Sequence, residues 1–270
     1  LSGVINSIKN ERIRRYRRLR KRSFRHKEQR FLVEGLRSVK EALYSPYELE
    51  CIICDQKGIE ALEAYADILH KRGIPCYSVT DEVMGAISTT VTPQGITAIC
   101  HMLHLDLAEL LDRNPSLILA ANRVRDPGNL GNMVRVADAA GTQGMIICRE
   151  SVDIYNPKTV RSTAGSIFHL PVSIDMSIDH AVNELHERGY TVYAADAHNG
   201  SDMWDIEWPH RLALVMGNEA WGMPQEEEAL ADARVRIPLF GKAESLNVSA
   251  AAAVLLVSAL VMWVILDLIY

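Results

Sequence analysis

The sequence predicts an α/β protein of two consecutive domains, the second of which contains a mainly parallel β-sheet. Three observations lead to this fold class. The chain has 270 residues, enough for one large or two ordinary domains with separate cores. It is 48% hydrophobic and 23% charged, as is typical of globular proteins. Short apolar runs alternate with helical patterns in both halves, and parallel strands need such crossover helices.

The first thirty residues are strongly basic. They hold twelve of the 29 Lys and Arg and two of the 34 Asp and Glu, so the other 240 residues hold 17 basic and 32 acidic side chains. A basic segment on an acidic body favours a polyanionic partner. Tyr16 and Phe24 are interleaved with the cations of residues 9–30. We therefore expect this segment to contact nucleic acid, the alternative being a solvated charged face.

The cysteines favour a cytoplasmic protein without a metal site. They are an odd number and lie in apolar runs, which is typical of reduced, buried thiols. Cys51 and Cys54 have the spacing of half a zinc site, but no matching second pair follows. No secretory signal sequence is predicted, because the basic start lacks a cleavable apolar core. The five are Cys51, Cys54, Cys76, Cys100 and Cys148.

The first half of the chain predicts a compact α/β/α domain. Residues 103–114 become polar toward Pro115 and are predicted to be a linker. The expected strands lie at residues 31–35, 49–54, 76–79 and 96–100, and the expected helices at 36–43, 59–71 and 81–87.

The second half repeats the alternation and predicts the mainly parallel sheet. Ligands of such sheets bind beyond the carboxyl ends of the strands. The strands are expected at residues 117–121, 145–148, 170–174, 191–195, 212–216 and 235–239, and the helices at 131–140, 159–166, 178–188, 224–231 and from 248 onward.

The last helix is unusually apolar. From Val248 to Leu266 only Ser249 and Ser258 are polar, and such a stretch is long enough to span a bilayer. The alternative is a helix buried in a core or a dimer interface, where the four alanines at 250–253 permit close packing. We favour the second, because the helix is tied to the strand and loop before it. No membrane association is expected.

Three turns beyond strand ends carry the candidate chemistry. In the first, residues 126–128 form a turn, Asn129 is a candidate helix cap, and Arg135 lies on the polar side of the helix. An arginine there is suited to binding a phosphate through two hydrogen bonds, although a plain surface arginine explains it equally well. The second turn, residues 217–222, is a glycine-rich elbow after a strand.

The third turn, residues 237–247, contains Pro238 and Gly241 and ends in Asn247, which is the natural N-cap of the last helix. A strand, a loop and a helix N-terminus in this order often hold a small ligand in α/β proteins. The elbow at 217–222 is not G-x-G-x-x-G, and no acidic residue lies where a dinucleotide requires one. A nicotinamide cofactor is therefore not expected.

Together the three turns resemble the three motifs of the SpoU, or TrmH, family of RNA ribose 2'-O-methyltransferases. Asn129 and Arg135 match N-x-x-x-x-x-R, residues 217–222 match G-N-E-x-x-G, and residues 237–249 match I-P-x-x-G-x-x-x-S-L-N-V-S. The order and the spacing both fit. The basic start and residues 31–35 are similar to the L30e-like RNA-binding domain of many members, so the resemblance covers nearly the whole chain.

The resemblance implies a domain organisation and a cofactor. Residues 1–30 would be a basic RNA-binding arm, 31–105 an L30e-like substrate-binding domain, 106–115 a linker and 116–270 a SPOUT methyltransferase domain with a deep trefoil α/β knot. Members are homodimers whose site is completed across the interface. The cofactor would be S-adenosylmethionine, and its contacts would fall to Gly217, Ile237 and Leu246.

The resemblance also implies roles for the polar residues of the turns. Arg135 either activates the ribose hydroxyl or anchors the substrate phosphate. The second role is at least as compatible with the chemistry as the first, because a free guanidinium does not lose its proton at neutral pH. Hydrogen bonds from the remaining catalytic residues would hold Arg135 and the ribose in place. These residues are Asn129, Glu219, Ser245 and Asn247.

The expected substrate is structured RNA. An L30e-like domain favours 23S rRNA, and the alternatives are tRNA 2'-O-methylation or a noncatalytic RNA-binding protein of the same fold. A polar segment at 161–166 is a further candidate for RNA contact, with a plain helix as the alternative. The residues expected to bind RNA are Arg14, Arg15, Arg17, Arg18, Arg22, Arg25 and Arg161.

Overall fold

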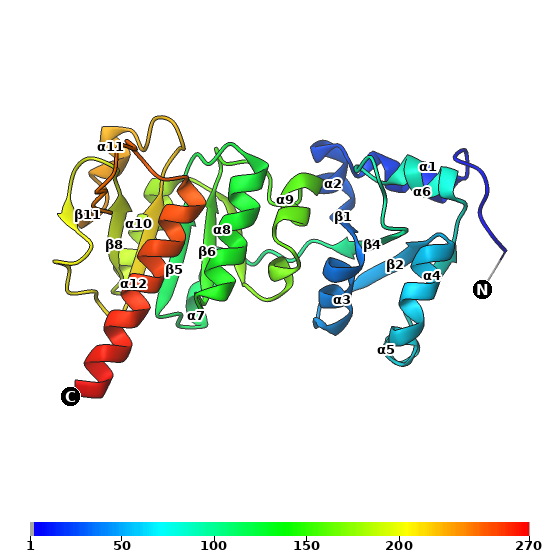
Figure 1. The fold of residues 1–270 in the computed structure, drawn as a ribbon, viewed down its shortest axis with the longest axis horizontal. Coiled ribbons are helices and arrows are strands. Elements are labelled where there is room, and N and C mark those ends of the chain that lie inside the picture. The colour runs from blue at the N-terminus through cyan, green and yellow to red at the C-terminus, as the bar shows by residue number, and fades with distance from the viewer. Residues whose placement is uncertain (1–2, 270) are drawn as a thin grey trace. The chain divides into compact units, whose positions relative to one another are not determined.

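The chain forms two compact units. The computed structural model describes the backbone of residues 3–269 and the side chains of residues 3–265. The first unit comprises the chain up to Leu103 together with Asp153–His169, and the second comprises His104–Val152 and the chain from Leu170 onward (Figure 1). The segment Asp153–His169 thus packs with the first unit, although it follows the second unit's first two strands in the sequence.

A four-stranded sheet forms the centre of the first unit. Its order is β1 (Arg30–Glu34), β4 (Ile96–His101), β2 (Leu49–Cys54) and β3 (Cys76–Ser78). β4 is antiparallel to both neighbours, and β3 runs parallel to β2. The helices of this unit are α1 (Glu11–Arg18), α2 (Arg22–Glu28), α3 (Leu36–Tyr44), α4 (Gln56–Leu62), η1 (Glu63–Tyr65), α5 (Ala66–Arg72), α6 (Asp81–Ile87), α9 (Pro157–Ser162) and η2 (Ser166–Phe168).

The basic segment belongs to the core of the first unit. Asn10 caps α1 by accepting a hydrogen bond from the backbone N–H of Arg12 at 3.0 Å. The apolar stripe of α1 and α2 is buried in one hydrophobic cluster with residues of β1, β2 and α6. The segment is therefore part of a folded domain, with its cations on the outer side, and is not a separate arm. The buried side chains are Ile13, Tyr16, Leu19 and Phe24.

Arg25 is the exception among these cations, because it is only 2% exposed. Its guanidinium donates to the backbone carbonyls of Leu19 at 2.9 Å and Arg20 at 2.8 Å, and it forms a buried ion pair with Asp153. A buried charge is retained only when it is paired in this way. The expected RNA contact through Arg25 is corrected by this placement, since no part of its side chain is free for a phosphate.

Replacing Asp153 by Ala is expected to destabilise the protein by about 3–5 kcal/mol, because the charge of Arg25 would stay buried without a counter-charge. The loss would be measured by urea unfolding. Arg14→Ala, which removes an exposed cation on α1 in the same basic segment, should leave stability within about 0.5 kcal/mol. A loss below about 1 kcal/mol for Asp153→Ala would show that water reaches Arg25.

The second unit is built on a seven-stranded parallel sheet. Its order is β7 (Val172–Met176), β6 (Gly144–Cys148), β5 (Leu117–Ala121), β10 (Leu212–Met216), β8 (Thr191–Ala195), β11 (Ala233–Arg236) and β9 (Ser201–Asp202). Every ladder is parallel. The predicted fold class is confirmed. The helices are α7 (Leu107–Asp112), α8 (Pro127–Ala139), α10 (Ile178–Glu187), α11 (Gln225–Glu228) and α12 (Val248–Ile269).

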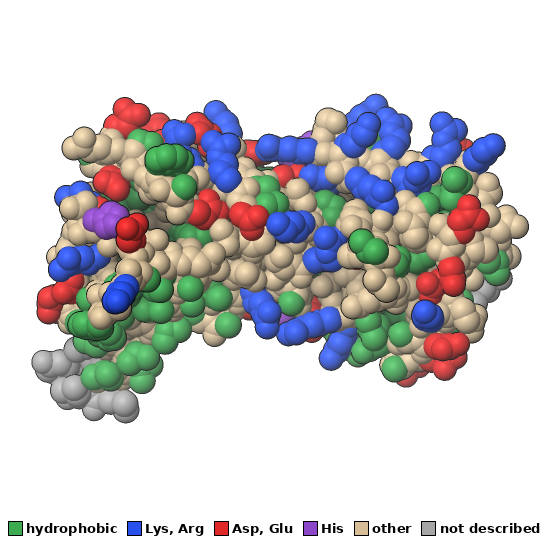
Figure 2. Space-filling model, turned by 45° about the horizontal axis from the view of Figure 1, so that its top comes forward, with side chains coloured by type: hydrophobic (Ala, Val, Ile, Leu, Met, Phe, Trp, Pro, Cys, Tyr) green, Lys and Arg blue, Asp and Glu red, His purple; other side chains and the backbone are tan. Residues whose placement is uncertain are grey.

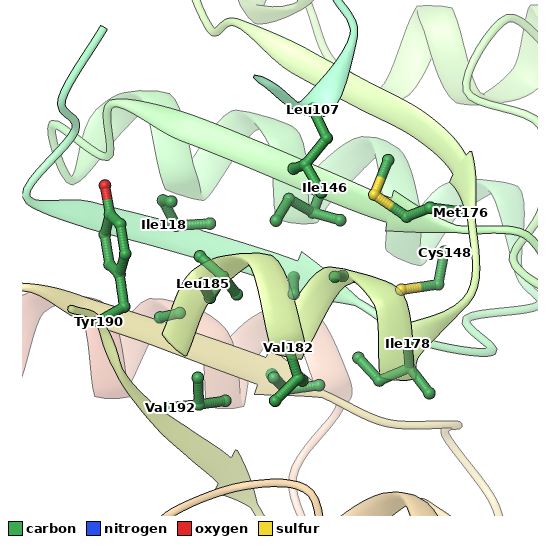
Figure 3. Close-up of a cluster of buried hydrophobic side chains, with 14 of the residues drawn as sticks. Leu107, Ile118, Ile146, Cys148, Met176, Ile178, Val182, Leu185, Tyr190 and Val192 are labelled. Carbon is green, nitrogen blue, oxygen red and sulfur yellow. The ribbon is translucent and has the colours of Figure 1, made fainter. Parts of the chain in front are cut away.

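Helices cover both faces of this sheet, which explains why its central strands are continuously apolar. On one face, Ile118 and Ile146 from the sheet pack with Leu107 of α7 and Leu185 of α10 (Figure 3). α8 and α12 pack against each other (Figure 1). The sheet thereby holds the carboxyl ends of β5, β10, β8 and β11 in fixed positions, and the loops that follow these strands are fixed with them.

Several predicted boundaries differ from the structure. The expected linker contains α7, whose start is a capping box in which Asp106 and Glu109 each accept a hydrogen bond from the other's backbone N–H. α8 begins at Pro127 because Asp126, and not Asn129, is its N-cap. The helix expected at 59–71 is interrupted by the 3-10 turn η1. The polar segment at 161–166 is helical in its first part.

Among the described residues, α12 is the one helix that is long and apolar enough to cross a membrane. This criterion considers length and composition only. Within its most apolar stretch, Val248–Ile265, 39% is buried inside the protein. Its inner side packs within the second unit, and Trp263 donates a hydrogen bond to the carbonyl of Trp208 at 3.1 Å. An apolar strip remains exposed along the helix (Figure 2). Its residues are Val254, Val257, Val261, Val264 and Ile265.

Candidate active site

Three loops meet at the carboxyl edge of the parallel sheet. They follow β5, β10 and β11, and they contain the three sequence motifs. The first loop leads into α8, where Asp126 accepts a hydrogen bond from the backbone N–H of Asn129 at 2.9 Å and Pro127 occupies the first helical turn. With the cap supplied by Asp126, the side chain of Asn129 is free to face the other two loops.

Asn129 joins all three motifs. Its side-chain N–H donates to a carboxylate oxygen of Glu219 in the elbow at 3.0 Å. Its side-chain carbonyl accepts from the side-chain N–H of Asn247, at the start of α12, at 2.8 Å. The side-chain amide of Asn129 thus uses both its donor and its acceptor. It links Glu219 and Asn247 into one hydrogen-bonded chain, although Asn247 lies 118 positions after Asn129 in the sequence.

Glu219 acts as the acceptor at the centre of this network. The backbone N–H groups of Arg125 and Asp126 donate to its two carboxylate oxygens at 3.2 and 3.1 Å. Burial alone would raise the pKa of this carboxyl, but the hydrogen bonds from Asn129 and the two amides outweigh it and lower the pKa. Glu219 is therefore ionised at neutral pH and is a weak base. Its role is to hold the first and second loops together.

The elbow that carries Glu219 is rigid. Asn218 and Gly222 exchange two backbone hydrogen bonds at 3.1 and 3.0 Å, and Gly222 has a φ of 65°, which favours glycine. The side chain of Asn218 accepts from the backbone N–H groups of Ala220 at 3.0 Å and Trp221 at 3.2 Å, and it donates to the carbonyl of Arg123 at 3.0 Å. Both ends of the turn are therefore fixed.

Asn247 caps the last helix, as predicted. Its side-chain oxygen accepts from the backbone N–H of Ser249 at 2.9 Å and from the Ser249 hydroxyl at 2.6 Å. The same side chain donates to Asn129, so it has two separable tasks.

A pair of substitutions at Asn247 should separate these tasks. Asn247→Ala removes the cap and the link, and it should destabilise the protein by about 1–2 kcal/mol. Asn247→Asp keeps a capping oxygen and loses the donor, and it should cost about 0.5 kcal/mol or less. Thermal unfolding measures both, with Lys242→Ala in the exposed loop as the control. Equal losses for Ala and Asp would show that the link, not the cap, stabilises this region.

A cavity of about 430 Å³ lies beyond the ends of β8, β10 and β11. Its apolar wall is formed by Met216, Val235 and the first turns of α12. The three residues expected to contact a cofactor, Gly217, Ile237 and Leu246, all line it, and so does Ser245. A cavity of this size accommodates a nucleoside-sized ligand.

The lining of the cavity is acidic. Four carboxylates and no Lys or Arg are found among the described residues that line the cavity. Burial and the neighbouring carboxylate of Asp196 raise the pKa of Glu228, and Arg234, 3.7 Å away, offsets this only in part. Such a lining favours a cationic ligand and disfavours a phosphate-bearing one. The four carboxylates belong to Asp196, Glu219, Glu228 and Glu244.

Asp196 was missed by the sequence analysis. It directly follows β8, and its carboxylate accepts from the backbone N–H groups of His198 at 2.8 Å and Asn199 at 3.1 Å. The sequence did contain a signal for Asp196, because an acidic residue directly after a predicted parallel strand lies at the sheet edge where ligands bind.

Arg135 lies apart from the other predicted catalytic residues. It is exposed on α8, six residues after Asn129 and so about 9 Å farther along the helix axis, and it does not line the cavity. Within residues 3–265 its side chain makes no hydrogen bond or ion pair. The structure thus groups Asn129, Glu219, Ser245 and Asn247 and leaves the guanidinium of Arg135 open to a ligand.

The arginines of the first unit that were expected to bind RNA differ in their exposure and in their ion pairs. Arg14 and Arg18 are exposed, and the guanidinium of Arg18 stacks on the ring of Phe24 at 4.0 Å. Arg15 is half-buried and paired with Glu28 and Glu50. Figure 2 shows Lys and Arg side chains gathered over the part of this unit that carries α1 and α2.

The remaining three arginines of this set, Arg17, Arg22 and Arg161, also differ in their exposure. Arg17 is half-buried and Arg22 is exposed. Arg161, on α9, is hydrogen-bonded to the hydroxyl of Thr89 and lies 3.4 Å from the carboxylate of Glu34, so much of its charge is used within the unit.

Comparison with known proteins defines the class. The profile of the SpoU rRNA Methylase family matches residues 116–257, and that of the MRM3-like substrate binding domain matches residues 10–98. The protein belongs to the SpoU rRNA methylase family. One relative is the 23S rRNA (guanosine(2553)-2'-O)-methyltransferase RlmP of Bacillus subtilis, 37% identical over 252 residues that cover 93% of this chain and 96% of the relative.

Solved structures agree over nearly the whole chain. The AdoMet-bound rRNA methyltransferase from Sinorhizobium meliloti has a TM-score of 0.85 and 30% identity, with 95% of this chain and 97% of that one covered. The SpoU methyltransferase AviRb from Streptomyces viridochromogenes, in complex with AdoMet, has a TM-score of 0.83 and 27% identity, with 95% and 99% covered.

Proposed function

We propose that the protein transfers a methyl group from S-adenosylmethionine to a ribose 2'-hydroxyl of 23S rRNA. The observation that carries this proposal is the acidic cavity at the sheet edge, next to the hydrogen-bonded Asn129, Glu219 and Asn247. RlmP of Bacillus subtilis and a 23S rRNA (uridine(2479)-2'-O)-methyltransferase of Streptomyces viridochromogenes, 30% identical over 236 residues, support the choice of 23S rRNA over tRNA.

The cavity fits this methyl donor. S-adenosylmethionine carries a sulfonium, an ammonium and one carboxylate, so its net charge is positive, and it supplies an electrophilic methyl group. The carboxylates of the lining match these positive charges, while the apolar side chains of Val248, Ala251 and Leu255 provide a surface for the adenine. Gly217, Ile237 and Leu246 would hold the cofactor mainly through their backbone.

The reaction requires positioning and the removal of one proton. The 2'-oxygen forms a bond to the methyl carbon as the carbon–sulfur bond breaks, and the hydroxyl proton passes to a substrate phosphate or to water. Arg135 keeps its own proton, because its guanidinium is too weak an acid to lose one at neutral pH. Its part is to bind the phosphate beside the target ribose and to orient the hydroxyl, while Ser245 and Asn247 hold the ribose.

The exposed strip on α12 supports a proposal for the assembly. A homodimer that buries Val257, Val261 and Val264 against a second copy would remove this apolar surface from water. A cytoplasmic dimer, in which residues 237–256 pass through the loop of a trefoil knot, agrees with the resemblance. In this proposal, exposed arginines of the first unit bind the phosphates of the RNA. They are Arg14, Arg18 and Arg22.

Methyl transfer to defined RNA tests the proposal. The full chain would be incubated with tritiated S-adenosylmethionine and with 23S rRNA or tRNA from cells that lack the gene, and 2'-O-methyl positions would be mapped. We expect one labelled position in 23S rRNA and none in tRNA. Label in tRNA alone would favour the tRNA alternative, and binding of RNA without label would favour a noncatalytic protein.

A further inference from the structure

Trp221 is an exposed aromatic residue in an otherwise fixed turn. Its side chain is 89% exposed, although its backbone N–H is bound to the side chain of Asn218 at 3.2 Å within the elbow. The elbow holds the neighbouring Glu219 in the network with Asn129. A tryptophan fully in water on a rigid turn is costly to keep, and exposed aromatic residues that are held in place are typical of binding surfaces.

The position of Trp221 limits what it can bind. It stands at the rim of the acidic cavity and not on its apolar wall, because so little of its ring is covered. A ribose whose 2'-hydroxyl reaches a methyl donor in that cavity carries its base within a few ångströms of the rim. Arg135, on α8, would bind the phosphate of the same strand. The indole is therefore within reach of a base and is not needed to enclose the cofactor.

We propose that Trp221 is a substrate-positioning residue that stacks on an unpaired nucleobase of the RNA, either the base of the target nucleotide or its neighbour. This inference rests on the proposed function. Stacking on an aromatic ring is indifferent to the sequence of the base and requires that the base be unstacked from its own strand. It follows that the target nucleotide lies in a loop, a bulge or an end, and not within a regular RNA helix.

The test compares Trp221→Ala and Trp221→Phe with Trp204→Ala, which removes another exposed tryptophan that does not line the cavity. Trp221→Ala is expected to raise the KM for 23S rRNA about tenfold, with the KM for S-adenosylmethionine unchanged. Trp221→Phe should recover most of the loss, and Trp204→Ala should behave as the wild type. Quenching of tryptophan fluorescence by a short RNA oligonucleotide should be lost in Trp221→Phe and kept in Trp204→Phe.

Three outcomes would overturn the inference. An unchanged KM for RNA together with unchanged quenching would show that no base stacks on Trp221. A raised KM for S-adenosylmethionine alone would place the indole against the cofactor. A shift of Trp221→Ala to a smaller species in light scattering would place it in an interface between copies of this chain. If the wild type transfers no methyl group, the proposed function fails, while the quenching comparison still decides whether Trp221 binds RNA.

Discussion

Replacing Arg135 by Ala is expected to lower kcat/KM for RNA methylation about a thousandfold, while the affinity for S-adenosylmethionine stays unchanged. The reason is that the guanidinium is exposed on α8, lies outside the cavity and is committed to no other group in the described part of the chain. Its loss therefore removes a contact to the RNA and leaves both the cofactor cavity and the Asn129 network intact. Single-turnover methyl transfer and isothermal titration of the cofactor measure the two quantities.

Two further variants define what Arg135 does. Arg135→Lys keeps the charge and loses the planar fork, so it should recover little if the phosphate is bound through two hydrogen bonds. Arg188→Ala removes a cation at the end of α10 that is paired with Asp112, and it should leave activity unchanged. A loss smaller than about tenfold for Arg135→Ala would contradict a role in the reaction.

Gly217→Ala is expected to weaken S-adenosylmethionine binding at least a hundredfold and to destabilise the second unit by about 1–3 kcal/mol. A Cβ at this position would lie 2.8 Å from the side chain of Met223 and 2.9 Å from the backbone of Gly222. The backbone of Gly222 cannot yield without opening the Asn218–Gly222 turn, which would move Glu219 away from Asn129. Cofactor titration and thermal unfolding check the two effects.

The control for this change is Gly85→Ala. Gly85 lies within α6, and a Cβ there meets nothing within 4 Å. Alanine should stabilise that helix by up to about 1 kcal/mol, since glycine is the poorer helix former. Cofactor binding by Gly217→Ala at the wild-type level would mean that the elbow relaxes around the methyl group and that its shape is not critical.

The sequence predicted the central strands of the second unit well, and β5 and β10 are buried at every position. The bounds of β7 and β11 differ from the predicted ranges, and the short edge strand β9 was not predicted. The apolar runs at 117–121, 191–195 and 212–216 coincide with β5, β8 and β10 at both ends. Errors arose where a local signal was overlooked. The pair Asp106 and Glu109 is a capping box that marks α7, and Asp126 before Pro127 marks the start of α8.

Long-range contacts were beyond the reach of local patterns. Arg25 has the same sequence surroundings as its exposed neighbours, but in the fold it is buried and pairs with Asp153, 128 residues later. The acidic character of the cavity depends in the same way on residues from four separate segments. The family, by contrast, was predicted from three motifs and is confirmed, because those motifs are contiguous and each follows a strand end.

The first unit is built from two separate stretches of the chain, and this affects how the chain folds during its synthesis. Asp153–His169 completes this unit, and it leaves the ribosome only after β5 and β6 of the second unit. Until then Arg25 lacks its counter-charge and Phe31 lacks the ring of Tyr155, which lies 4.8 Å away in the folded protein. The N-terminal unit therefore cannot reach its final stability before β5 and β6 of the second unit have been synthesised, so its folding is not finished when its first 103 residues leave the ribosome.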